Sequence, residues 1–397
     1  IFTLENPQRL IVQFPKIFKN EIRELITNGL YNSKTIKSDY QGPIKYYSLE
    51  LNTNKDNTIK PVVSRDENLN FMLKELSKTA KENKAIAGIN GGYFSAKTKF
   101  PLGLLIVNGE LLSAPIYNRS ALLIKKDNSF EIKNIDLNIS LKVYDIEGTS
   151  RLIKINAFNQ PPVKNQLVLF NYNYGKNNLN NLQQNVPSVI NDNKSQENPE
   201  NNSADKVEEP PKEVPVEFSG YILTNQGNRI IKVENFNTKL PENGFILYAS
   251  GTAKDELERT IQNSTYYELV FNFSEPMLNV LHAIGGGPAL IKNNAINITS
   301  QPEKFKPDIT EGKAPRTALS FLNNGRLLLF VVDGRQDSSI GLTLEELANL
   351  LKDLGAKDSI NLDGGGSSSM FLNNEIINSI SDKKERKINS SILIFKK

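Results

Sequence analysis

The sequence contains no cysteine, one histidine and no tryptophan. The absence of cysteine excludes disulfides, thiolate nucleophiles, iron–sulfur clusters and cysteine-ligated zinc. A single histidine excludes a multi-histidine metal centre and leaves His282 as the one candidate for histidine-dependent catalysis. Without tryptophan, a sugar ring that stacks on an aromatic side chain must use one of the 13 Tyr or 19 Phe residues.

The charges are nearly balanced, since 48 Lys and Arg against 44 Asp and Glu give a net charge of +4 without a dense basic block. Nucleic-acid binders usually concentrate positive charge on one face, so we expect no nucleic-acid partner. No apolar run reaches the roughly 18 residues that a membrane helix needs, so no transmembrane segment is expected. The sequence begins at Ile1 rather than Met, and we expect a periplasmic or secreted protein whose signal peptide has been removed. The oligomeric state is left open.

One segment, about 171–215, is rich in Asn and then in Glu, Lys and Pro. It has too few apolar residues to offset the entropy cost of ordering the chain. We predict a disordered surface insertion over about 185–215, with an interdomain linker as the alternative. The predicted organisation is a β-rich lead-in over 1–43 and one domain over 44–397 that contains the insertion.

The recurring pattern elsewhere is the β-hairpin. In GLLIVNGELL (103–112), two apolar runs meet at Asn108-Gly109, a pair that suits a type I′ turn. The same pattern recurs in four further segments: 121–132, 288–297, 317–332 and 370–378. This density of hairpins favours antiparallel or mixed sheet.

Two segments, 69–80 and 343–354, have the apolar spacing of amphipathic helices. The second begins with the capping-box pair Thr343 and Glu346 and is followed by Gly355 at the C-cap position.

Strand 327–332, helix 343–354 and strand 359–362 together predict a βαβ unit whose two strands lie parallel as neighbours. We therefore predict an α+β fold with a mixed β-sheet, many hairpins, one βαβ unit near the C-terminus and a few packed helices.

Glycine clusters follow several of the predicted strands: AGINGGYF (87–94), HAIGGGPALI (282–291), VVDGRQ (331–336) and INLDGGGSSSM (360–370). Consecutive glycines let backbone amides approach a ligand closely. The predicted substrate-binding residues come from these clusters: Asn90, Gly91, Gly92, Tyr93, Gly286, Gly287, Gly334, Arg335, Gly364, Gly365, Gly366, Ser367 and Ser368.

Asp333 and Asp363 follow the two strands of the predicted βαβ unit, so their carboxylates are expected within roughly 5 to 10 Å of each other. Arg316 opens the strand that turns back into the Asp333 strand, which brings both residues to one edge. Its planar fork suits a phosphate group, and the alternative is a structural ion pair with Asp333. No cofactor is expected, and a Ca²⁺ or Mg²⁺ ion held by the two aspartates is a further alternative.

The ring side chains of His282 and Tyr93 and the serines 367–369 each have competing interpretations. His282 serves as an acid/base or substrate hydrogen-bond donor, or as a structural residue bound to a backbone carbonyl. Tyr93 forms a wall for a sugar ring or belongs to the core, where we expect Phe94. A Ser-His-Asp triad that uses Ser367–Ser369 is disfavoured, because no G-x-S-x-G elbow is present.

In this order, INGGYF, APRTALS, VVDGRQ, GLTLEELANLLKDLGA and INLDGGGSSSM resemble the motifs of the phosphodiester glycosidase family, over roughly residues 44–397. That family includes the uncovering enzyme, an N-acetylglucosamine-1-phosphodiester alpha-N-acetylglucosaminidase. The resemblance implies a bacterial hydrolase of sugar-1-phosphodiesters with a glycan or glycolipid substrate in cell-envelope or exopolysaccharide metabolism. The opening NPQRLIVQFP is similar to the envelope-targeting modules that precede this domain in some cyanobacterial proteins.

The resemblance also implies which positions line the pocket: Asn90 to Gly92, Arg316, Asp333 with Gly334, and Asp363 to Ser367. A sugar-1-phosphate leaves as a stable anion, so such a site needs an anion clamp and one carboxylate near the anomeric carbon. Asp333 or Asp363 would act as nucleophile or as base. The alternatives are a non-catalytic module that binds phosphoglycan or peptidoglycan, and an ordinary glycosidase.

Overall fold

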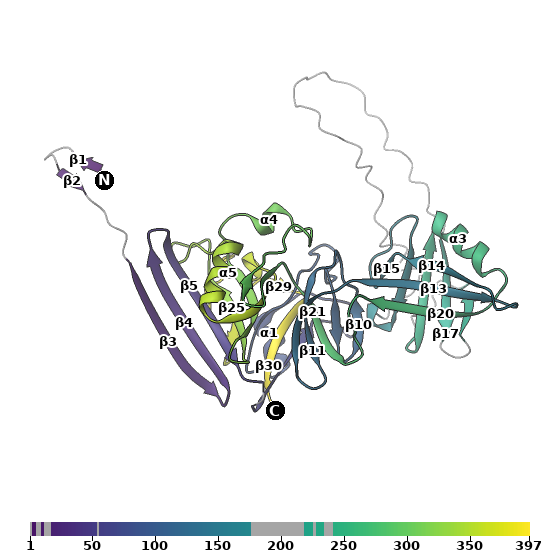
Figure 1. The fold of residues 1–397 in the computed structure, drawn as a ribbon, viewed down its shortest axis with the longest axis horizontal. Helices are drawn as coiled ribbons and strands as arrows, with labels where there is room; N and C mark the ends of the chain where they lie inside the picture. The colour runs from purple at the N-terminus through teal and green to yellow at the C-terminus, as the bar shows by residue number, and fades with distance from the viewer. Residues whose placement is uncertain are drawn as a thin grey trace, which may run out of the picture. The chain divides into compact units, whose positions relative to one another are not determined.

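The computed structural model describes residues 2–4, 9–11, 17–53, 55–175, 218–224, 228–233 and 241–397. Its internal contacts divide the chain into unit 1 (Ile1–Leu137 and Phe273–Lys397) and unit 2 (Asn138–Asn272). Both units consist mostly of strands, which confirms an α+β fold dominated by β-structure (Figure 1). The insertion predicted over 185–215 lies outside the described residues, and the boundary after residue 43 stays a prediction. No described helix is long and apolar enough to cross a membrane.

Unit 1 contains an eight-stranded sheet whose strand order is β23-β22-β26-β24-β25-β5-β4-β3. These strands are β3 (Phe18–Thr27), β4 (Leu30–Asp39), β5 (Gly42–Leu51), β22 (Ala289–Lys292), β23 (Ala295–Ile296), β24 (Arg316–Leu322), β25 (Leu327–Val332) and β26 (Ala356–Asn361). All adjacent pairs in this sheet are antiparallel, so it is not the mixed sheet that the sequence predicts.

The predicted contact between the two strands of the βαβ unit is wrong. β24 lies between β25 and β26 and is antiparallel to both, so β25 and β26 run parallel without touching. The reason is the hairpin at 317–332, which places β24 against β25 before the chain reaches β26. That hairpin is itself confirmed, with Arg316 opposite Val332 at its open end.

Two five-stranded sheets complete the main part of unit 1. The first has the order β28-β27-β8-β30-β6, with β6 (Asn57–Val63), β8 (Ala87–Asn90), β27 (Met370–Leu372), β28 (Glu375–Ile376) and β30 (Ser390–Lys396). The second has the order β10-β9-β21-β11-β12, with β9 (Leu105–Val107), β10 (Glu110–Ser113), β11 (Ser120–Lys125), β12 (Phe130–Asn134) and β21 (Val280–Gly285). Two small pairs are β1 (Phe2–Leu4) with β2 (Arg9–Ile11), and β7 (Lys74–Glu75) with β29 (Lys387–Ile388).

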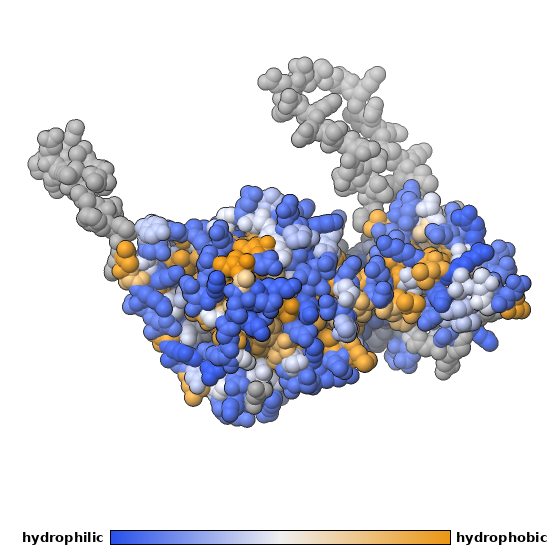
Figure 2. Space-filling view, viewed as in Figure 1, coloured by the Kyte–Doolittle hydropathy of each residue, from blue (hydrophilic) through white to orange (hydrophobic). Residues whose placement is uncertain are grey.

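The eight-stranded sheet is buried on both faces around β24 and β25. One face packs on the two five-stranded sheets, through residues such as Leu329, Ile89 and Leu122. The other face packs under α5 (Leu344–Asp353), through Phe330 and Leu347 (Figure 1). Burial on both faces explains why β25 reads as an unbroken apolar run. Hydrophilic residues cover much of the surface of unit 1 in Figure 2.

The predicted helix at 343–354 is confirmed as α5, with the capping box between Thr343 and Glu346 and with Gly355 in the left-handed region (φ 87°). The helix predicted over 69–80 is wrong at its start, because α1 spans only Leu76–Glu82. Leu69 has φ 62°, and the Asp66 carboxylate accepts hydrogen bonds from backbone N–H groups in a local turn, so the chain there is not helical. A short helix, α4 (Pro307–Thr310), lies before β24.

The five predicted hairpins are confirmed. Asparagine occupies a left-handed turn position in four of them, and Gly325 does so in the hairpin at 317–332. Asn108 has φ 54° before Gly109, and the pairs 293–294 and 373–374 are both Asn-Asn with positive φ. Asparagine tolerates this backbone region better than most residues, which is why these turns are readable from sequence.

The described part of unit 2 contains two sheets and one α-helix. Its three-stranded sheet has the order β14-β13-β20, with β13 (Leu137–Asp145), β14 (Ser150–Ile155) and β20 (Ser264–Phe273). Its five-stranded sheet has the order β15-β16-β19-β17-β18, with β15 (Ala157–Phe158), β16 (Leu167–Asn171), β17 (Phe218–Thr224), β18 (Arg229–Lys232) and β19 (Gly244–Ser250). β15 and β16 are parallel and the other adjacent pairs are antiparallel, which makes this a mixed sheet. The helix is α3 (Thr252–Ile261), and a 3-10 turn, η1 (Tyr172–Tyr174), follows β16.

Candidate active site

A pocket of about 230 Å³ opens in unit 1, beside the end of β26 and the start of β24. Its lining residues are Tyr93, Asp308, Ile309, Ala314, Arg316, Arg335, Asn361, Asp363, Gly364, Gly365, Gly366 and Arg386. Seven of the residues predicted from the sequence are therefore gathered here, namely Tyr93, Arg316, Arg335, Asp363, Gly364, Gly365 and Gly366. The pocket combines three guanidinium groups with carboxylates.

Asn90, at the end of β8, holds the Asp363 loop in place. Its amide nitrogen donates to the Asp363 carbonyl at 2.6 Å, and its oxygen accepts from Thr317 Oγ1 at 2.8 Å and from the Ser369 N–H at 3.1 Å. The Asp363 N–H in turn donates to the Gly91 carbonyl at 3.3 Å. Because Asn90 is buried, it positions the loop between β8 and β24 and does not line the pocket.

Asp363 is partly exposed at the pocket, and burial raises the pKa of its carboxyl to about 6. The Ser367 hydroxyl, the Arg386 charge and the Gly364 N–H each lower this pKa and so limit the rise. Such a carboxyl changes its charge near the pH at which many hydrolases work, as expected for a catalytic acid or base.

Arg316 lines the pocket, but much of its hydrogen-bonding capacity is directed to the backbone. Its Nε donates to the Leu342 carbonyl at 3.0 Å, Nη1 to Ile309 at 2.7 Å and Nη2 to Gly312 at 3.0 Å. Three of its five N–H groups are thereby engaged. No ion pair between Arg316 and Asp333, the alternative weighed from the sequence, occurs in the described structure.

Tyr93 and Asn361 form another wall of the pocket. The Tyr93 hydroxyl donates to the Gly287 carbonyl at 2.9 Å and accepts from Asn361 Nδ2 at 2.8 Å. Burial raises the pKa of Tyr93, so the phenol stays neutral, and its ring contacts Phe305 with centroids 5.4 Å apart. Phe94 packs against a core cluster, as predicted.

Asp333 does not line the pocket, although the sequence placed it beside Asp363. It is fully buried; its Oδ1 accepts from Asn378 Nδ2 at 3.2 Å and from the Ser379 N–H at 3.0 Å. Its Oδ2 lies 3.6 Å from Lys45 Nζ. Burial raises the pKa of Asp333, while the Asn378 bond and the Lys45 charge oppose that rise.

His282 also lies away from the pocket lining. It sits in β21, and its Nδ1 accepts a hydrogen bond from the Asn108 N–H at 3.1 Å. The sequence-based structural interpretation had the opposite polarity, with the ring donating to a carbonyl. Burial, together with the charge of Lys60, lowers the pKa of His282 to about 4, so the ring is neutral at ordinary pH.

The other predicted glycines occupy points of close backbone approach. A Cβ on Gly92 would lie 2.3 Å from the Gly285 carbonyl oxygen, and one on Gly286 would lie 2.7 Å from that of Asn361. A Cβ on Gly91 would lie 2.8 Å from the Ser390 carbonyl oxygen, and one on Gly334 would lie 2.6 Å from the Pro315 nitrogen. These glycines do not line the pocket, and neither do the buried Ser367 and Ser368.

Sequence reasoning missed five lining residues: Asp308, Ile309, Ala314, Asn361 and Arg386. Asn361 was visible as the last residue of β26, two positions before Asp363. Arg386 had no motif to mark it. It pairs with Asp382, Nε to Oδ2 at 3.0 Å, and a Cβ on Gly366 would collide with this pair.

The donor set does not form a metal cage in the part of the chain that the structure describes. No group of three or more His, Cys, Asp or Glu side chains there is arranged to hold an ion. Ca²⁺ and Mg²⁺ sites draw on several oxygen ligands, and Asp333 is held by Lys45 and does not face Asp363.

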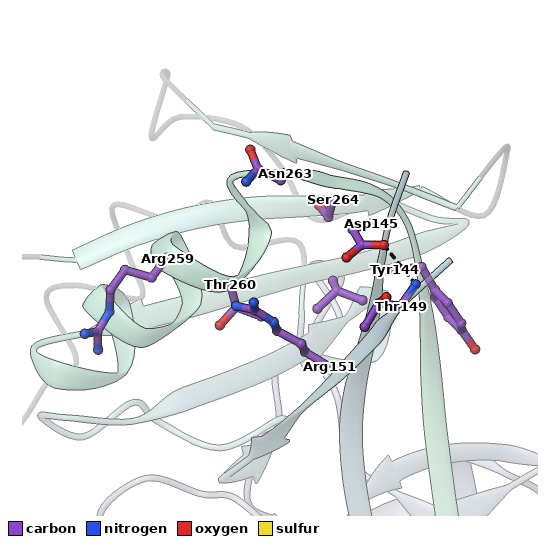
Figure 3. A pocket seen from close by; sticks show the side chains of 9 residues that line it. Tyr144, Asp145, Thr149, Arg151, Arg259, Thr260, Asn263 and Ser264 are labelled. Atoms are coloured by element: carbon purple, nitrogen blue, oxygen red, sulfur yellow. Dashed lines mark hydrogen bonds between the residues drawn. The ribbon is translucent and has the colours of Figure 1, made fainter. Parts of the chain in front are cut away.

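Unit 2 has a smaller pocket of about 70 Å³, shown in Figure 3. It includes Arg151, Arg259 and Asp145. The Asp145 carboxylate accepts from the Thr149 N–H at 2.8 Å and from the Glu147 N–H at 3.0 Å, which closes a hairpin turn. A second pocket of unit 2, of about 340 Å³, is lined by Tyr221, Lys232, Glu258 and neighbouring residues. Neither pocket of unit 2 contains a residue predicted from the sequence, so we place the candidate site in unit 1.

Comparison with known proteins agrees with the sequence motifs. Residues 216–395 match the family model described as phosphodiester glycosidase. This confirms the resemblance over that range; the INGGYF motif lies outside it, but its Tyr93 reaches the same pocket. An 82-residue segment is 37% identical to an uncharacterized SPbeta prophage-derived protein of Bacillus subtilis (strain 168). A 67-residue segment is 40% identical to the N-acetylglucosamine-1-phosphodiester alpha-N-acetylglucosaminidase of Mus musculus.

These matches are partial. The segments cover 21% and 17% of this chain and 13% of each of the two curated relatives. Among solved structures, a hypothetical protein from Synechocystis is similar with a TM-score of 0.72 and 18% identity, over all of this chain and 67% of that one. At that identity the likeness shows a shared fold.

Proposed function

We propose that this protein hydrolyses a sugar-1-phosphodiester bond, because residues 216–395 match the phosphodiester glycosidase family model. The substrate class is a glycan or glycolipid phosphodiester similar to GlcNAc-1-phosphodiester, in cell-envelope or exopolysaccharide metabolism outside the cytoplasm. The observation that carries the proposal is the pocket, which joins the Asp363 carboxyl to the guanidinium groups of Arg316, Arg335 and Arg386.

This combination matches the charge changes of the reaction. Water adds to the anomeric carbon, the bond from that carbon to the phosphate oxygen breaks, and a phosphomonoester leaves as an anion. A leaving phosphate needs little protonation, so the usual second carboxylic acid of a glycosidase is dispensable. Guanidinium groups stabilise the departing charge, and one carboxylate stabilises or attacks the oxocarbenium-like carbon.

Asp363 is the carboxylate of this scheme. Its pKa near 6 leaves it mostly ionised at neutral pH, while its partial burial keeps it basic enough to take a proton from water. The Tyr93 ring, fixed by Asn361 and Gly287, supplies an apolar wall against which a sugar ring can lie.

The test is release of free sugar from a GlcNAc-1-phosphodiester by the whole chain, followed with anomer-resolved detection. Asp363→Asn keeps the shape of the side chain and should lower kcat by at least about a thousandfold, because it removes the base or nucleophile. The matched control is Asp353→Asn, an exposed aspartate at the end of α5, which should leave turnover unchanged. Undiminished turnover in Asp363→Asn would contradict the proposal.

The second candidate is a non-catalytic module that binds phosphoglycan. The position of Asp333 outside the pocket favours this second candidate, because the predicted pair of facing carboxylates is absent. A binder would retain affinity for the phosphodiester in Asp363→Asn and in Asp353→Asn. Neither these variants nor the wild type would release sugar.

A further inference from the structure

We infer that Arg335 holds the phosphate group of the substrate, while Arg316 maintains the shape of the pocket wall. This assignment rests on the proposed function and refines the sequence-based prediction, in which Arg316 clamps the phosphate and Arg335 is one of the substrate-binding residues. It follows from which guanidinium groups are free to bind an anion, from the backbone of Arg335, and from its place beside the glycine loop.

The other two guanidinium groups have internal partners. Arg316 is 3% exposed and donates from all three of its nitrogens to backbone carbonyls. Arg386 donates to Asp382 through both Nε and Nη2. Arg335 is exposed, and its guanidinium makes no hydrogen bond or ion pair with any described residue. It is the pocket arginine whose complete planar fork remains available for a phosphate.

The backbone of Arg335 is held in an unfavourable conformation. Its φ is 59°, in the left-handed region, where most of the other non-glycine residues of the described chain are asparagine. The preceding Gly334 is packed so tightly against Pro315, Ala314 and Gly341 that it has no room for a Cβ. Left-handed geometry is unfavourable for a residue with a long side chain and tends to persist where function requires it.

This geometry brings the guanidinium against the glycine loop. A Cβ built on Gly365 would lie 3.5 Å from Arg335 Nη1 and 3.6 Å from Nη2, so the fork lies beside the loop that follows Asp363. Arg335 and Arg316 are close enough for the positive charge of Arg335 to lower the pKa of Arg316, whose burial lowers it more. Two neighbouring positive charges favour a doubly charged anion between them, which is the charge state of a phosphomonoester product.

The experiment uses Arg335→Asn, because asparagine suits the left-handed backbone and the variant should fold normally. The expected result is a loss of about a hundredfold in kcat/KM on the GlcNAc-1-phosphodiester and a similar loss of inhibition by inorganic phosphate and GlcNAc-1-phosphate. Arg335→Lys should restore part of both, since lysine supplies charge without a fork. The matched control is Arg229→Ala, an exposed arginine of unit 2, which should change neither quantity.

The readouts separate this inference from the proposed function. Normal turnover and normal phosphate inhibition in Arg335→Asn would overturn the role of Arg335 and leave the hydrolase intact. If the wild type releases no sugar, calorimetric titration with GlcNAc-1-phosphate decides the matter. Binding that is lost in Arg335→Asn but kept in Asp363→Asn supports Arg335 as the phosphate site, and equal binding in both overturns it.

Discussion

Asp333 and Asp363 follow two parallel strands of the same sheet, and their surroundings differ in almost every respect. Asp363 follows β26 and reaches a pocket beside glycines and arginines. Asp333 follows β25, where the neighbouring β5 brings Lys45 against it, and the 378–379 segment covers its other oxygen. A carboxylate at a strand end is therefore functional or structural according to what the neighbouring strand places beside it.

The difference also assigns a role to the buried carboxylate. Asp333 fixes Asn378 and Ser379, and the same segment continues to the Asp382–Arg386 pair that lies over Gly366. Asp333 thus positions part of the pocket wall without touching the reacting groups.

The largest contrast between the two aspartates is expected in stability. Burial raises the pKa of both aspartates, but Asp333→Asn also leaves the Lys45 ammonium without its carboxylate partner and should lower the free energy of unfolding by about 3 kcal/mol. Asp363→Asn removes a charge that the fold disfavours, so at pH 7.5 it should leave stability unchanged or raise it by about 1 kcal/mol. Urea unfolding followed by tyrosine fluorescence measures both.

A double variant sharpens this test. Lys45→Met together with Asp333→Asn should recover part of the lost stability, because the partly buried ammonium that has lost its carboxylate partner is gone. Two results would contradict the division into a structural Asp333 and a functional Asp363. One is equal destabilisation by the two aspartate variants, and the other is loss of turnover in a fully folded Asp333→Asn.

The second contrast is in pH dependence. If ionised Asp363 is the active form, kcat/KM should fall about tenfold per pH unit below pH 6 and be constant above it. The stability contribution of this group runs the other way. Since its folded pKa is raised, the contribution is fully present below about pH 4 and is lost as the pH rises through about 6.

Kinetics and thermal unfolding from pH 4.5 to 8 reveal both trends in one series of buffers. Asp363→Asn should remove the stability trend. A rate profile that is flat across pH 6 would show that another group controls the reaction.

The sequence was sufficient where local chemistry decides structure. The Asn-Gly and Asn-Asn turns specified the hairpins, and Thr343 with Glu346 specified the start of α5. The glycines after β26 pointed to the pocket because only a loop without side chains can approach Pro315 and Arg316 so closely.

The rest depends on tertiary contacts that no local pattern encodes. The position of β24 between β25 and β26 follows from the packing of whole sheets, and the carbonyl partners of Arg316 come from residues 309, 312 and 342. Arg386 lies in a polar segment without periodicity, so only its contact with the glycine loop marks it.

The smallest effect is expected at His282, for which the sequence left a catalytic and a structural interpretation open. His282→Gln should change kcat/KM by less than about twofold, because the ring lies in β21 and accepts from Asn108 away from the pocket. Its folded pKa is lowered, so its stability contribution is present above about pH 6.5 and is lost as the pH falls toward 4, the reverse of Asp363. The His282→Gln variant lacks this loss. The difference in unfolding free energy between variant and wild type should therefore shift in favour of the variant as the pH falls from 7.5, by on the order of 2 kcal/mol near pH 5. A large loss of turnover without this change in acid stability would place His282 in the reaction. The reacting groups would then not be confined to the pocket.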